Sequence, residues 1–266
     1  MLDAAWMGGV RLIDTSASYG ETERRLGNLM SDSQPFDIVS KPPHLSETDS
    51  EGLRAFIENA AHNSLANLKR DRLKCLMLRN ADELHIHRKS KILDVLFGMK
   101  RAGMFDQIGI SLYRPDELDI ALEDGFDLIQ IPVSILDQRF VVDKRLRKAH
   151  EKGIEIHARS AFLQGILTLS LDRLPTYFHS AEVAIIDIQR IALELGVSVI
   201  EAAVGFCHSV PEVDYVIIGA ERADQVSEFC VMPRKTIPYG VFASAAISDE
   251  TLLLPANWPI RKDLLP

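Results

Sequence analysis

The chain has 266 residues, of which 47% are hydrophobic and 26% charged, and its formal net charge is −8 at pH 7. This length and composition predict a globular protein with a sizeable core, and we expect one domain over residues 1–266. The acidic balance argues against a general binder of nucleic acid or of anionic membranes. No apolar run approaches the roughly 20 residues of a membrane helix, and no signal peptide is visible.

The three cysteines, Cys75, Cys207 and Cys230, show no zinc-like spacing and lie in apolar segments. They are typical of reduced core thiols, so we expect a cytoplasmic protein. No cluster of His, Asp and Glu has the spacing of metal ligands, and the sequence therefore predicts no metal site.

Short apolar runs alternate with longer amphipathic runs along the chain, after a first segment, Met1–Gly9, that resembles the end of a helix. The short runs predict strands over Val10–Asp14, Asp37–Lys41, Leu73–Arg79, Gln107–Ser111, Leu128–Pro132, Glu155–Arg159 and Tyr215–Gly219. The amphipathic runs predict helices that include Ser50–Leu68, Arg88–Ala102, Lys144–Lys152, Ala181–Leu195 and Val199–His208. This alternation indicates a parallel sheet with helical crossovers.

Two parallel architectures fit this alternation. A doubly wound dinucleotide-binding sheet calls for G-x-G-x-x-G after a strand, and the chain has none. Several predicted strands end in polar residues, and the site of a (β/α)8 TIM-type barrel lies at the C-terminal ends of its strands. We therefore predict a barrel. Only seven strands are found where eight are needed, so the first strand is apparently missing.

The most specific stretch is residues 12–27, Leu-Ile-Asp-Thr-Ser-Ala-Ser-Tyr-Gly-Glu-Thr-Glu-Arg-Arg-Leu-Gly. It resembles the Asp-Thr-Ala-x-x-Tyr-Gly-x-Ser-Glu-x-x-Leu-Gly signature of aldo-keto reductases. Weaker resemblances to the same family follow in the expected order: Ile108–Ser111, Gln130–Pro132, Leu136–Arg139, Arg159–Gly165 and Ile217–Val226. In that family the first strand precedes the helix that Met1–Gly9 resembles, and its absence predicts two unpaired edges through which copies could associate.

The resemblance implies a catalytic group of Asp14, Tyr19 and Lys41, in which Tyr19 protonates the carbonyl oxygen of a small-molecule substrate. A free phenol has a pKa near 10, and a nearby ammonium lowers it. Asp14 would pair with Lys41 and hold it. The plain structural alternative is an Asp–Lys bridge inside a barrel, with Tyr19 as a bystander.

One catalytic position departs from the family pattern, because Arg79 stands where the fourth family strand usually ends in histidine. A second cation beside Lys41 is expected to lower the pKa of Tyr19 further. An excessive shift would leave a phenolate, which cannot donate a proton. Arg79 could instead bind the carbonyl or a substrate carboxylate, or be an inert substitution in a decayed site.

For the cofactor, the resemblance implies NADPH or NADH. The implied contacts are Gln130 with the nicotinamide amide, Ser160 and Leu163 near the pyrophosphate, and Gly219, Arg222 and Gln225 around the adenosine; Ser111 belongs to the same predicted set. Arg222 suits a 2′-phosphate and so favours NADPH, although Glu221 beside it weakens that preference.

Three functions therefore stay open. The first is an NADPH-dependent oxidoreductase that reduces an aldehyde or ketone to an alcohol, and a sugar-like carbonyl compound is one candidate substrate. The second is a catalytically impaired member of the family with a binding or regulatory role. The third is a non-redox barrel enzyme, such as a lyase, that acts on anionic substrates through Arg79 and Lys41.

Overall fold

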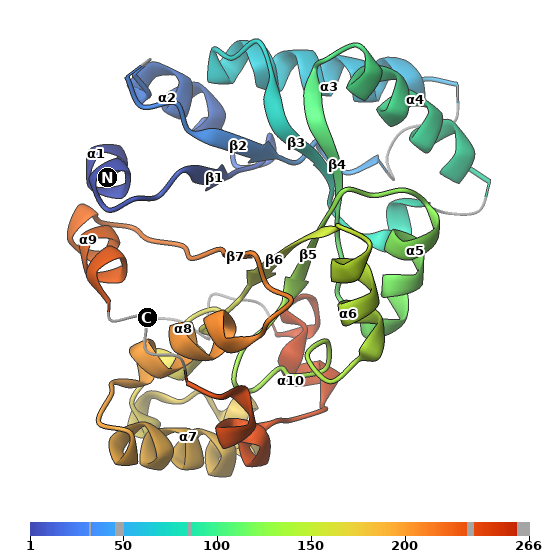
Figure 1. Cartoon of the computed structure of the whole chain (residues 1–266). Helices are drawn as coiled ribbons and strands as arrows, with labels where there is room; N and C mark the ends of the chain where they lie inside the picture. The colour runs from blue at the N-terminus through green and yellow to red at the C-terminus, as the bar shows by residue number, and fades with distance from the viewer. Residues whose placement is uncertain (32, 46–50, 85–86, 233–236, 260–266) are drawn as a thin grey trace.

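The computed structural model describes residues 1–266 except 32, 46–50, 85–86, 233–236 and 260–266 (Figure 1). The described residues form one sheet of parallel strands in sequence order, β1-β2-β3-β4-β5-β6-β7. The strands are β1 (Leu12–Asp14), β2 (Asp37–Ser40), β3 (Leu73–Leu78), β4 (Phe105–Ser111), β5 (Leu128–Pro132), β6 (Glu155–Arg159) and β7 (Tyr215–Val216). The sheet curls into an incomplete (β/α)8 barrel of seven strands, which confirms the predicted fold class.

Helices connect the strands and surround the sheet (Figure 1). They are α1 (Leu2–Met7), α2 (Thr22–Leu29), α3 (Leu53–Leu68), α4 (Lys89–Arg101), α5 (Leu118–Glu123), α6 (Lys144–Glu151), α7 (Glu182–Glu194), α8 (Val199–Ser209), α9 (Ala223–Val231) and α10 (Glu250–Leu253). The predicted helices are therefore present with small differences at their ends. The largest difference in a strand is at β7, which ends at Val216 instead of Gly219.

Alternating side chains of the strands build two apolar layers. One set points outward and packs under the helices, as Ile108 and Ile110 of β4 do. The other set fills the barrel interior, where Val39, Cys75, Met77 and Leu128 form a separate buried cluster. Gly109 belongs to this interior, because a Cβ there would lie 2.7 Å from the Cys75 sulfur. The lack of a side chain at Gly109 therefore lets β3 and β4 pack their inner faces closely.

The two ends of the sheet, β1 and β7, do not pair with each other in the described part of the chain. Their helices close the outer layer instead, because α1 packs against α9 (Figure 1). This contact is tight at Gly8, where a Cβ would lie 2.2 Å from the sulfur of Cys230. The predicted open edges are thus present in the strands, while association of copies through them stays a prediction.

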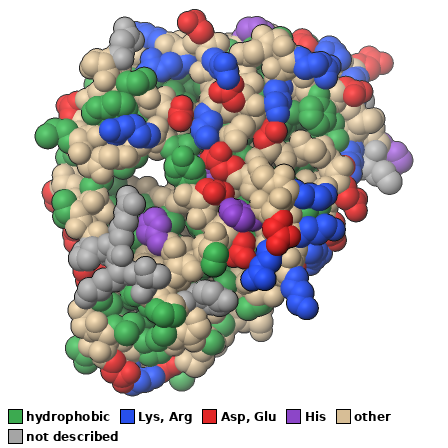
Figure 2. Space-filling view, in the orientation of Figure 1, with side chains coloured by type: hydrophobic (Ala, Val, Ile, Leu, Met, Phe, Trp, Pro, Cys, Tyr) green, Lys and Arg blue, Asp and Glu red, His purple; other side chains and the backbone are tan. Residues whose placement is uncertain are grey.

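The basic residues at the start of α6 lie on a solvated face of that helix. Arg147 and Lys148 are exposed, while Leu146 and Ala149 point inward and are buried. Figure 2 shows Lys and Arg side chains gathered where α5 and α6 lie, with acidic side chains between them. None of the described helices has the length and apolar character to cross a membrane.

Candidate active site at the mouth of the barrel

A cavity of about 1330 Å³ lies at the C-terminal ends of the strands. Its lining comes from the loops after the strands and from the C-terminal segment around Leu254 and Asn257. The lining includes the predicted residues Asp14, Tyr19, Lys41, Arg79, Ser111, Gln130, Ser160, Gly219 and Gln225. Residues from both halves of the sequence therefore meet in one place, as the strand-end rule for barrels requires.

Asp14 and Lys41 form an ion pair at the base of this cavity. The Lys41 Nζ lies 2.6 Å from both carboxylate oxygens of Asp14, and their side chains are only 8% and 11% exposed. The pair forms because β1 and β2 are neighbours in register, with Asp14 opposite Val39. Burial lowers the pKa of Lys41, and the charge of Asp14 offsets part of that effect. From β5, the Gln130 amide donates to Asp14 at 2.9 Å and fixes the carboxylate from a third strand.

Tyr19 lines the same cavity from the turn between β1 and α2, and it is 53% exposed. Its pKa is raised above the ordinary value of 10.0, first by burial of the phenol and then by the charge of Asp14. Arg79 and Arg159 lower it, but they do not reverse the shift. These two cations thus lower the pKa of Tyr19, as predicted for Arg79, but burial and Asp14 outweigh them. Tyr19 keeps its proton at neutral pH and can donate it.

Arg79 follows β3 and reaches back to the loop that carries Tyr19. Its Nη1 donates to the Ser16 hydroxyl at 2.8 Å, and that hydroxyl donates to the backbone oxygen of Lys41 at 3.1 Å. The backbone N–H of Arg79 donates to the buried carboxylate of Glu83 at 3.0 Å. The same carboxylate accepts from the Leu45 N–H at 3.2 Å. These bonds hold three strand ends together around the cavity.

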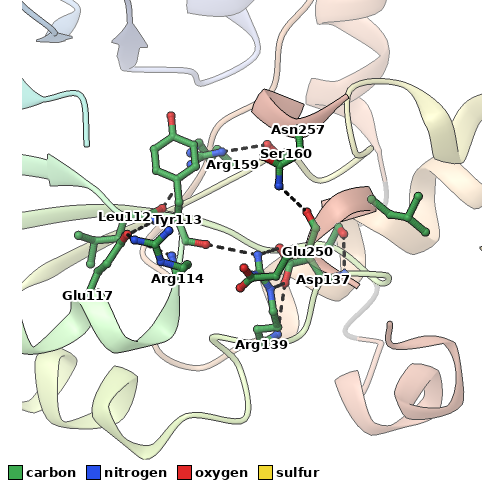
Figure 3. Close-up of polar contacts among 12 residues, drawn as sticks. Leu112, Tyr113, Arg114, Glu117, Asp137, Arg139, Arg159, Ser160, Glu250 and Asn257 are labelled. Atoms are coloured by element: carbon green, nitrogen blue, oxygen red, sulfur yellow. Dashed lines mark hydrogen bonds and ion pairs between the residues drawn. The ribbon is translucent and has the colours of Figure 1, made fainter. Parts of the chain in front are cut away.

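A second arginine, Arg159 at the end of β6, also lines the cavity. Figure 3 shows its guanidinium behind the ring of Tyr113, with the two 4.3 Å apart. It donates to the Leu112 carbonyl and to the Ser160 hydroxyl, both at 3.3 Å. The sequence had marked Arg159 only as a polar strand end. Side chains alternate between the two faces of a strand, so Arg159 shares a face with Glu155 and His157. This alternation could have predicted that Arg159 points into the barrel.

Next to Arg159, the loop of residues 160–165 borders the cavity with an unusual backbone. Ser160, Leu163 and Gln164 have φ angles of 63°, 45° and 55°. Residues other than glycine rarely adopt this left-handed backbone conformation. This conformation turns the Leu163 side chain into the core, where it is buried and outside the cavity lining. Its predicted contact with a pyrophosphate therefore has no side-chain basis.

The residues predicted for the adenosine end come together only in part. Phe162 and Phe229 stack at 5.8 Å and both line the cavity, as do Gly219 and Gln225. The Gln225 side chain caps α9 by accepting from the N–H groups of Glu221 and Arg222 at 2.9 and 3.2 Å. Arg222 itself is exposed, lies outside the lining and pairs with Asp224 at 3.0 Å. Its predicted role with a 2′-phosphate therefore requires a different side-chain position.

His44 also lines the cavity. Its ring is 48% exposed and lies 3.5 Å from the Glu83 carboxylate. The three cysteines are free thiols; Cys75 and Cys207 are buried, and burial raises the pKa of Cys207 to about 12. None of them lines the cavity.

The parallel barrel and its polar mouth place the chain among the α/β-barrel proteins, whose functional sites lie at the C-terminal ends of the strands. Within that class, the model of the aldo/keto reductase family matches residues 1–231. The chain belongs to the aldo/keto reductase family, whose members are oxidoreductases that act on carbonyl groups. Family membership confirms the resemblance first seen at residues 12–27.

Solved structures support the fold. The aldo-keto reductase AKR11C1 from Bacillus halodurans, in its holo form, is 21% identical over 92% of this chain and 86% of its own, with a TM-score of 0.76. The glycerol dehydrogenase AKR11B4 from Gluconobacter oxydans is 21% identical over 100% of this chain and 88% of its own, with a TM-score of 0.73. No curated protein matches the sequence.

Proposed function

We propose that this chain reduces an aldehyde or ketone to an alcohol, with NADPH as the electron donor and NADH as the alternative. The observation that carries the proposal is that the Asp14–Lys41 pair and a protonated Tyr19 line the same cavity. Because all sheet strands contribute to this mouth, the proposal also treats residues 1–266 as one functional domain.

The cavity suits a nicotinamide dinucleotide in size and chemistry. About 1330 Å³ exceeds the upper end of the volumes typical of small-ligand pockets, roughly 1,000 Å³, and so leaves space for a dinucleotide beside a substrate. Ser111, Gln130 and Ser160 supply neutral polar groups along it, and Phe162 with Phe229 supplies an aromatic wall for a flat base. An ideal Cβ at Gly219 would meet no atom within 4 Å, so this position leaves further open space.

The chain's own residues then handle the proton. A bound nicotinamide would supply the hydride for the carbonyl carbon, and the carbonyl oxygen would then need a proton. Tyr19 donates its phenol proton to that oxygen, because its raised pKa keeps the proton on the phenol at neutral pH. Asp14, which Lys41 holds in an ion pair, acts electrostatically on the phenol, and so does Arg79.

The test is the loss of reduced-cofactor absorbance with a panel of aldehydes and ketones, for the wild type and for Tyr19→Phe. We expect Tyr19→Phe to abolish turnover and to leave cofactor affinity within a few-fold. Tyr215→Phe, at a half-exposed tyrosine outside the cavity lining, is the matched control and should retain activity. Full activity in Tyr19→Phe would overturn the assignment.

A second candidate, a binding or regulatory protein without catalysis, is favoured by Arg79 in the place of the expected histidine. Cofactor binding without turnover of any carbonyl compound would support it. The variant Arg79→His separates the two cases further. A rise in activity would show that Arg79 impairs an inherited site, and a fall would show that Arg79 is used.

A further inference from the structure

The charged groups that line the cavity are not equally paired. Lys41 is neutralised by Asp14, and Arg114 pairs with Glu117 at 3.1 Å. Among the described residues, the guanidinium groups of Arg79 and Arg159 form no ion pair with any carboxylate. The acids left in the lining, Asp82 and Glu221, are exposed to water at its edge. The inner cavity therefore has two cations that form no ion pair with the described residues, although Glu83 acts electrostatically on Arg79, and Asp137 and Asp14 act on Arg159.

Each of these guanidinium groups is also incompletely hydrogen-bonded. The Nε atoms of Arg79 and Arg159 are buried and have no partner among the described residues. A buried charge without a partner is costly, and polar groups inside proteins are nearly always bonded. The neighbouring contacts, Ser16 for Arg79 and Tyr113 for Arg159, orient the groups and leave donors unused. Such an arrangement is suited to an anion that arrives with its own acceptors.

The two arginines lie near the reacting position. Arg79 follows β3 and Arg159 ends β6, strands that β4 and β5 separate in the sheet, and both arginines line the same cavity. Both also act electrostatically on the Tyr19 phenol, together with Asp14. An anion bound by them would therefore lie close to the group that protonates the carbonyl.

We propose that the carbonyl substrate of this protein carries an oxyanion, a carboxylate or a phosphate, which Arg79 and Arg159 bind beside Tyr19. The inference rests on the proposed function for the reaction, but the anion contact is a separate property of the cavity. Guanidinium groups bind carboxylates and phosphates through two parallel N–H bonds, and this geometry distinguishes them from an ammonium. A neutral carbonyl compound would leave both charges unpaired.

The experiment measures binding by calorimetry, with and without NADPH, so that it does not depend on turnover. The carboxylate probes are pyruvate and levulinate, each against its methyl ester, and the phosphate probe is dihydroxyacetone phosphate against dihydroxyacetone. We expect at least one anionic probe to bind about 10-fold or more tightly than its neutral partner, the range of a charged hydrogen bond. The pair that shows the preference identifies carboxylate or phosphate.

The variants Arg79→Gln and Arg159→Gln should each remove most of that preference, and Arg79→Lys and Arg159→Lys should restore only part of it. The control is Arg114→Gln, an arginine of the same lining already paired with Glu117, which should retain the preference. Thermal melting of every variant checks that the fold is intact. If Arg79→Gln or Arg159→Gln unfolds, the anion preference of the corresponding lysine variant is compared with that of the wild type instead.

Two results would overturn the inference. One is equal binding of the anionic and neutral probes, or no binding of either, by the wild type. The other is a loss of NADPH affinity in Arg79→Gln and Arg159→Gln with an unchanged anion preference, because the arginines would then bind the phosphates of the cofactor. An anion preference without any turnover would retain the inference about binding and overturn the proposed reductase function.

Discussion

The Lys41 ammonium bonds both oxygens of the Asp14 carboxylate at 2.6 Å, although 27 residues separate the two in the chain. The pair joins β1 to β2 at the point where each strand reaches the cavity, and Gln130 adds β5 to the same carboxylate. A contact that we propose to serve the chemistry thus also ties an end strand of the sheet to its neighbours.

Removing one partner of this pair should be costly for stability. Asp14→Asn leaves the Lys41 charge buried without compensation, which we expect to destabilise the fold by about 3–5 kcal/mol. The double variant Asp14→Asn, Lys41→Met should recover most of the loss. Urea unfolding measures both, and a double variant as unstable as the single one would show that the pair contributes little.

The pH dependence of Asp14→Asn has a definite sign. Burial already lowers the pKa of Lys41 in the folded chain, and the loss of Asp14 lowers it further. Between that lowered value and the ordinary 10.5, the unfolded state binds more protons than the folded state. The deficit of the variant should therefore shrink as the pH rises toward 10.5, because Lys41 then becomes neutral in both states.

Activity should be insensitive to Tyr19 titration across the neutral range. Because the pKa of Tyr19 lies above 10.0, the phenol keeps its proton until the pH exceeds that value. We expect kcat/KM for a neutral ketone to fall on the alkaline side only above pH 10. Arg79 lowers this pKa, so Arg79→Gln should move the alkaline limb upward. A limb that moves downward in this variant would contradict the assignment.

The sequence sufficed to bring Asp14, Tyr19, Lys41 and Arg79 together, because a parallel barrel collects its strand ends at one mouth. It did not predict the direction of the Tyr19 pKa shift, which depends on how far the phenol is buried. The burial of Leu163 depends on a left-handed backbone that no spacing rule reveals. The ion pair of Arg222 with Asp224 could have been predicted from the sequence, because the two residues are only two positions apart.

Cofactor preference should depend on Arg222 and its partner. In this structure the Asp224 carboxylate competes for the guanidinium. We expect Arg222→Ala to weaken NADPH several-fold more than NADH. Asp224→Asn, which frees the guanidinium and removes a negative charge, should strengthen NADPH. Fluorescence titration measures both affinities, and equal changes for the two cofactors would exclude Arg222 from the 2′-phosphate site.

The contact between α1 and α9 predicts a sensitive glycine. Gly8→Ala would place a methyl group 2.2 Å from the Cys230 sulfur, so the helices must separate. We expect a loss of about 1–3 kcal/mol, as for an overpacked core position. The control is Gly98→Ala in α4, where the nearest atom, on Arg101, is 4.0 Å away. There the change should be neutral or stabilising by up to about 1 kcal/mol. Urea unfolding measures the free energy of unfolding of both variants. Similar stabilities of the two variants would contradict a tight contact at Gly8.

The seven-stranded sheet, whose end strands do not pair with each other, sets a gradient of protection for the amide hydrogens of the backbone. At the centre, β3 and β4 share five register pairs, whereas β6 and β7 share two. Hydrogen exchange should therefore be slowest at Cys75–Leu78 and Gln107–Ile110 and fastest at β1 and β7, where opening costs the fewest bonds. The Asp14 end of the candidate site thus rests on the most readily opened edge of the sheet, while Arg79 follows its most protected strand.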